Sequence, residues 1–107
     1  MATNLPNQYV SIRKRFKAYS KALDTLGKAV KEAGPLDDKM GHLIQIAAAA
    51  SIRSEGAVHS HTRRALEAGA TPEEIRHAIL LISSTIGFPT VSAALSWADD
   101  IIEGAQE

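Results

Sequence analysis

The sequence contains no cysteine among its 107 residues. Disulfide bonds, zinc sites built from thiolates, and nucleophilic or redox-active thiols are therefore excluded. Long hydrophobic runs are also missing: the longest, such as Ile46 to Ala50, are far shorter than the roughly 20 residues that a membrane-spanning helix needs. Polar residues such as Asn4 and Asn7 interrupt the N-terminus, which lacks the apolar segment of a secretory signal. We therefore expect a cytoplasmic protein with no membrane partner.

An excess of charge of either sign is missing too. The chain carries 12 basic and 12 acidic residues, which gives a formal net charge of +0. Such a balance provides no whole-molecule field that would attract nucleic acid or an anionic membrane. Basic residues do cluster between Arg13 and Lys21, but we interpret this cluster as a solvated helix face. No nucleic-acid partner is expected.

Strand signals are absent, and the apolar residues recur at helical spacing instead. The pattern predicts an all-α fold, a single-domain helical bundle of about five helices that spans residues 1–107. The expected helices run from Gln8 to Glu32, from about Asp37 onward, from Ser54 to Gly69, from Thr71 to Ile86, and from about Val91 onward, after a break at residues 87–89. The second helix is apolar nearly all round, so we expect it to be central.

The clearest helix boundary lies between the third and fourth expected helices. Gly69 is suited to end one helix, and Thr71, Pro72 and Glu74 form a capping box that begins the next. A chain of this length buries only a modest core by itself. Association into a homo-oligomer is therefore a reasonable expectation.

The stretch from Leu36 to Asp100 resembles the carboxymuconolactone decarboxylase and alkylhydroperoxidase D-like superfamily. Its most specific part is the segment HTRRALEAGATPEEI, which has a histidine early in one helix, a glycine stop and a Thr-Pro-Glu start. The resemblance is strongest over residues 36–100. It implies an alkylhydroperoxidase D-like fold and a homo-oligomer, commonly a trimer or a hexamer.

The thiol-active branch of this superfamily has a glutamate on the central helix, a CxxC pair and a histidine four residues beyond it. In this chain, His61 matches the histidine. His42 stands at the glutamate position, and Ser54 and Ala57 stand at the two cysteine positions. Three of the four positions depart from the pattern, so peroxidase chemistry that depends on the CxxC pair is excluded. The decarboxylase branch also lacks the cysteines and keeps the histidine.

The candidate catalytic residues are His61 and His42, which in the family fold would face one pocket. There, two imidazoles could divide the roles of proton donor and acceptor. Each also has a structural interpretation, as a core histidine bonded to a backbone carbonyl for His61 and as a solvent-facing residue for His42. Arg53 is the candidate for binding a substrate carboxylate.

The other histidines do not suggest a metal centre. His59 and His61 are two residues apart, so they point to opposite sides of a helix, and His77 is expected to face outward. We expect no cofactor and no metal.

The sequence leaves two main functions open, besides a helical adaptor that would rest only on the basic cluster of the first helix. One is a lyase that acts on a small carboxylated lactone or a related acid by histidine acid/base chemistry. The other is a non-catalytic member of the family that binds a small ligand or serves as an oligomeric scaffold. In either case the expected partner is a small carboxylate.

Overall fold

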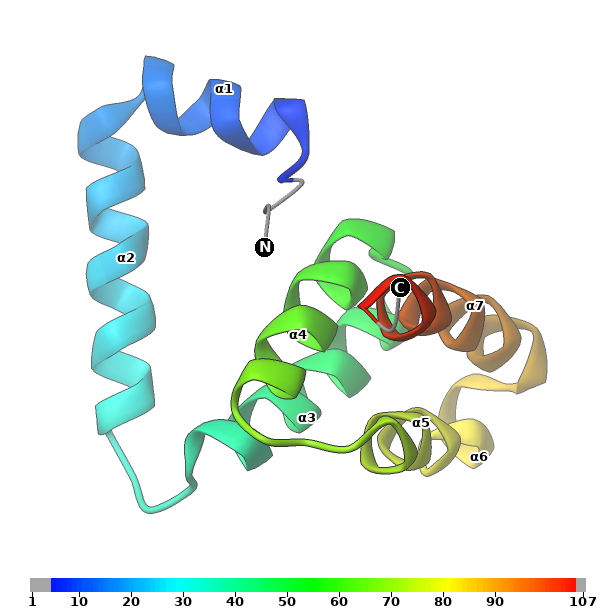
Figure 1. Cartoon of the computed structure of the whole chain (residues 1–107). Helices are drawn as coiled ribbons and strands as arrows, with labels where there is room; N and C mark the ends of the chain where they lie inside the picture. The colour runs from blue at the N-terminus through cyan, green and yellow to red at the C-terminus, as the bar shows by residue number, and fades with distance from the viewer. Residues whose placement is uncertain (1–4, 106–107) are drawn as a thin grey trace. The chain divides into compact units, whose positions relative to one another are not determined.

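The computed structural model describes residues 5–105, and these residues form helices and no strand. The all-α prediction is therefore confirmed. The chain contacts divide after Pro35 into two compact units, each described here by itself. The first contains α1 (Asn7–Arg15) and α2 (Lys17–Glu32). The second contains α3 (Asp38–Ser51), α4 (Glu55–Glu67), α5 (Pro72–Leu80), α6 (Ser83–Ile86) and α7 (Phe88–Ala105) (Figure 1).

Two of the expected helices are each divided into two. The first expected helix is divided at Phe16, whose backbone leaves the helical region with φ −125° and ψ 68°. No proline or glycine stands at that position, so the break has no local sequence signal. The fourth expected helix is divided after Leu80, where the Ser83 hydroxyl donates to the Leu80 carbonyl oxygen at 2.7 Å. That side chain competes with the helical backbone for an acceptor.

Side-chain caps begin α3, α4 and α5 where the sequence predicted them. Asp37 accepts from the backbone N–H of Met40 at 2.9 Å, and Ser54 caps α4 in the same way. The capping box that begins α5 is complete, because Thr71 and Glu74 each accept from the other's backbone N–H. These bonds satisfy N–H groups that have no partner inside the helix.

Two helix ends use a residue with positive φ. Gly69 ends α4 with φ 97°, and the N–H of Ala70 bonds back to the carbonyl of Ala65 at 2.9 Å. Arg53 takes the equivalent position after α3 with φ 56°. Glycine adopts this conformation freely, whereas a side chain costs about 1 kcal/mol or more there. The turn between α3 and α4 is therefore strained at Arg53.

The core of the second unit lies between α3, α4, α5 and α7. Ile46 of α3, Val58 of α4, and Ile75 and Ile79 of α5 are all fully buried. In Figure 1, α3 and α4 lie along one another, and α3 also contacts α5 and α7. The central position predicted for this helix is confirmed. No helix in the described part of the chain is both long and apolar enough to cross a membrane.

One side of α3 is apolar and uncovered. Met40, Ile44, Ala48 and Ile52 follow one another at four-residue spacing and are exposed; they are called the α3 stripe below. The nearly all-round apolar character of this helix thus reflects two apolar faces, one in the core and one at the surface.

Candidate functional site

The structure brings His42 and His61 into contact. His42 lies in the second turn of α3, and His61 lies in the middle of α4. Their Nδ1 atoms are 3.3 Å apart, and the ring centroids are 5.5 Å apart with an interplanar angle of 33°. Both side chains are half-buried. The extensive packing between α3 and α4 therefore positions the pair.

The contact between two Nδ1 atoms constrains the tautomers. A hydrogen bond at this place requires that one ring carry a proton on Nδ1 and that the other accept there. When both rings are neutral, the donating ring has a bare Nε2 and the accepting ring has a protonated Nε2. The pair can thus offer one proton acceptor and one proton donor at the same time, the combination that acid/base chemistry needs.

The surroundings keep His61 neutral. Its pKa is lowered from 6.5 to about 4, mainly because burial penalises the charged imidazolium. The positive charge of Arg64 and the neighbouring His42 lower the pKa further. At neutral pH His61 is therefore available to accept a proton.

Arg64 also acts on this site, although the sequence analysis did not single it out. It is exposed on α4, three residues after His61, and its charge acts on that imidazole. Residues three apart on a helix are neighbours on its surface, so this spacing was the available signal. The charge of Arg64 therefore influences the protonation of the histidine pair.

Comparison with known proteins identifies the family. The sequence model of the carboxymuconolactone decarboxylase family matches residues 17–100. The chain belongs to that family. It is 31% identical over 105 residues to uncharacterized protein MJ1511 of Methanocaldococcus jannaschii, which covers 94% of this chain and 98% of the relative.

A solved structure of a family member has the same fold. The crystal structure of apo-lpg0406, a carboxymuconolactone decarboxylase family protein from Legionella pneumophila, superimposes with a TM-score of 0.75. The match covers 88% of this chain and 87% of the other, at 24% sequence identity. At that identity the likeness shows the fold alone. The recognition of the family from the sequence is confirmed.

The positions of the superfamily's thiol pair have structural roles in this family member. The Ser54 side chain accepts from the backbone N–H of Ala57 at 3.4 Å and so caps α4. Ala57 is partly buried against the core. With no cysteine anywhere in the chain, a thiol-dependent peroxidase reaction is excluded.

Arg53 lies at the junction between α3 and α4. Its Nη1 donates to the hydroxyl of Thr90 at 2.9 Å, which ties the junction to the first turn of α7. Its strained backbone marks it as a functional candidate, because such strain often persists where a side chain is needed. Binding of a substrate carboxylate by Arg53 stays a prediction.

The remaining two histidines lie elsewhere. His59 Nε2 is 3.0 Å from Asp100 Oδ2 of α7. His77 is exposed on α5, as expected, and contributes to the rim of a shallow hollow.

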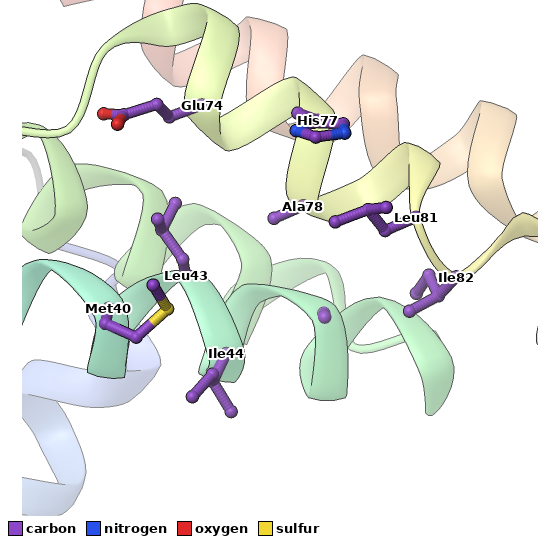
Figure 2. Close-up of a pocket in the computed structure, with 9 residues that line it drawn as sticks. Met40, Leu43, Ile44, Glu74, His77, Ala78, Leu81 and Ile82 are labelled. Atoms are coloured by element: carbon purple, nitrogen blue, oxygen red, sulfur yellow. The ribbon is translucent and has the colours of Figure 1, made fainter. Parts of the chain in front are cut away.

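That hollow lies between α3 and α5 and has a volume of about 370 Å³. Its lining is mostly apolar, and neither His42 nor His61 is part of it. Figure 2 shows Leu43 and Ile44 on α3, Ala78 on α5, and Leu81 directly after the end of α5. At the polar edge, Lys39 Nζ donates to Glu74 Oε2 at 3.2 Å. The hollow is therefore separate from the candidate acid/base pair.

Proposed function

We propose that this member of the carboxymuconolactone decarboxylase family is a lyase that removes carbon dioxide from a small carboxylated lactone. The observation that carries the proposal is the contact between His42 and His61, which supports an acid and a base in one place. In the reaction, the carbon–carbon bond to the carboxylate breaks and CO2 leaves. The electron pair left on the lactone framework then takes up one proton. The histidine pair would deliver and redistribute that proton.

We further propose that an arginine binds the substrate carboxylate. We assign this role first to Arg64, because its charge already acts on His61, and retain Arg53 as a second candidate. An anion that pairs with Arg64 would cancel one of the contributions that lower the pKa of His61, although burial, the largest of them, would remain. Substrate binding at Arg64 would therefore raise that pKa from its lowered value.

We further propose that the protein works as a homo-oligomer, a trimer or a hexamer, in the cytoplasm. The α3 stripe supports the association, because isolated chains seldom leave a continuous apolar strip on a central helix exposed. Two residues of the α3 stripe, Met40 and Ile44, also line the hollow between α3 and α5. The cytoplasmic location rests on the sequence alone.

The test is decarboxylation of carboxymuconolactone by the purified protein, followed by ultraviolet absorbance between pH 5 and 9. We expect turnover in the native protein and its loss in His61→Ala. The control is His77→Ala, which removes an exposed histidine outside the pair and should retain activity. Arg64→Gln should raise KM more than it lowers kcat if the arginine acts by binding the carboxylate. Absence of turnover at high protein concentration would eliminate this substrate.

The second candidate function is a non-catalytic family member that binds a small carboxylate or serves as a scaffold. It is favoured by the three departures from the thiol pattern at His42, Ser54 and Ala57. Saturable binding of a small carboxylate without turnover, measured by calorimetry, would support this alternative over the lyase.

A further inference from the structure

A cluster of three possible metal ligands lies where α4 meets α7. Glu55 and His59 are one turn apart on α4, and Asp100 comes from α7. His59 Nε2 is 3.0 Å from Asp100 Oδ2 and 3.9 Å from Glu55 Oε2. The three side chains each offer one ligand atom, and these atoms all lie within 4.8 Å of one another. None of the three residues belongs to the histidine pair or to the hollow.

We propose that Glu55, His59 and Asp100 bind a divalent transition-metal ion of the zinc type. Ligand atoms about 2.1 Å from a tetrahedral ion lie roughly 3.4 Å from one another, as zinc bond lengths require. The two distances measured from His59, 3.0 and 3.9 Å, lie on either side of that value. Small side-chain rotations would therefore place all three atoms on one ion. Imidazole and carboxylate together suit zinc and its neighbours in the first transition row.

The charge of the cluster also favours a cation. Even a protonated His59 contributes one positive charge against the two negative charges of Glu55 and Asp100. A divalent ion would neutralise both carboxylates, which a single imidazolium cannot do. Three protein ligands would leave the fourth coordination position for water, as in zinc sites that have only three protein ligands.

The backbone around the cluster is well fixed. Val58, next to His59, is fully buried, and Ile102 anchors the end of α7 in the core. Asp99, next to Asp100, accepts a hydrogen bond from Arg76 of α5 at 3.0 Å. The ligands from α4 and α7 are therefore presented by packed helices rather than by loose chain ends. This proposal departs from the sequence expectation of no metal, because the sequence could not reveal that Asp100 meets α4.

The proposal is tested by titrating the full chain with Zn²⁺ in a calorimeter after treatment with a chelator. We expect one ion per chain. His59→Ala and Glu55→Gln should each weaken binding by at least about tenfold, which is the lower range found even for groups that only support a metal ligand. The matched control is Glu73→Gln, because Glu73 is exposed in the first turn of α5 as Glu55 is in α4. That variant loses the same charge at a helix start and should bind Zn²⁺ as the native protein does.

A second readout is the midpoint of thermal unfolding. An ion that joins α4 to α7 should raise it in the native protein and in His61→Ala, but not in Glu55→Gln at the same Zn²⁺ concentration. If His59→Ala fails to fold, Glu55→Gln still tests the metal site, because this variant keeps the hydrogen bond between His59 and Asp100. Unchanged affinity in Glu55→Gln, loss of binding in His61→Ala, or no Zn²⁺ binding by the native protein would each overturn the proposal. None of these outcomes depends on decarboxylase activity.

Discussion

Burial of His61 links the candidate site to the stability of the fold. Its folded pKa is lowered to about 4, whereas the unfolded chain should titrate near 6.5. Between these values the unfolded state binds more protons than the folded state, so stability is lost as the pH falls through this window. The contribution of His61 to the unfolding free energy is therefore fully present above pH 6.5 and is lost as the pH falls toward 4.

The first prediction concerns this dependence on pH. Between pH 7 and pH 5 we expect the native protein to lose about 1 kcal/mol more unfolding free energy than His61→Gln, after allowing for solvent screening at this half-buried site. Urea unfolding at both pH values measures the difference. Parallel pH profiles for the two proteins would contradict the assigned burial of the imidazole.

Thr62 provides a second prediction. Its side chain is fully buried, and its hydroxyl has no hydrogen-bond partner among the described residues. An unpaired buried hydroxyl costs roughly 1–3 kcal/mol. Thr62→Val keeps the shape and removes the polar atom, so we expect it to raise the unfolding free energy by about 1 kcal/mol in denaturant titrations. Thr62→Ala, which leaves a cavity, should not give this gain, and a destabilised valine variant would imply a partner for the hydroxyl.

At the level of single residues, the sequence identified part of the candidate site. His61 and His42 could be proposed as catalytic residues because they occupy the histidine and glutamate positions of the superfamily's pattern. Arg64 was not singled out, although its spacing of three residues from His61 was an available signal. The contact between His59 and Asp100 could not be predicted either, because the two residues lie on helices that are distant in the sequence.

At the level of helices, the chain's start signals are strong. The third prediction is that Thr71→Ala lowers the unfolding free energy by about 1 kcal/mol, because the backbone N–H of Glu74 loses its bond to the Thr71 hydroxyl. Thr71→Ser keeps an oxygen acceptor and should retain most of that stability. Thermal unfolding of the three proteins checks the order, and an alanine variant as stable as the native protein would show that the cap contributes nothing.

Helix interruptions were harder to predict than helix starts. The caps at Asp37, Ser54 and Thr71 depend on local side-chain chemistry, which a sequence displays directly. The break at Phe16 has no such chemistry, and the break after Leu80 is accompanied only by a hydrogen bond from the Ser83 hydroxyl to the Leu80 carbonyl. The helical periodicity of the apolar residues therefore predicted one continuous helix at two places where the backbone forms two.

At the level of the whole molecule, the uncovered apolar surface is the main unexplained feature. The exposed residues of the second unit include Ile44, Ile52 and Leu81, although the same unit has a complete buried core. The sequence correctly placed α3 at the centre, but periodicity could not distinguish a helix buried on all sides from one that also has an apolar outer face. Association of several chains would account for that outer face.

The fourth prediction follows from this surface. Ile44 lies in the middle of the α3 stripe and is 49% exposed, so Ile44→Glu should leave the folded core intact. In an interface, however, the new carboxylate would be buried without a partner, which is strongly unfavourable. We therefore expect this variant to shift the molar mass measured by light scattering from an oligomer to a monomer. Gln45→Glu adds the same charge one residue along the helix, off the stripe, and should leave the mass unchanged; a native protein that is already monomeric would remove association as the reason for the exposed stripe.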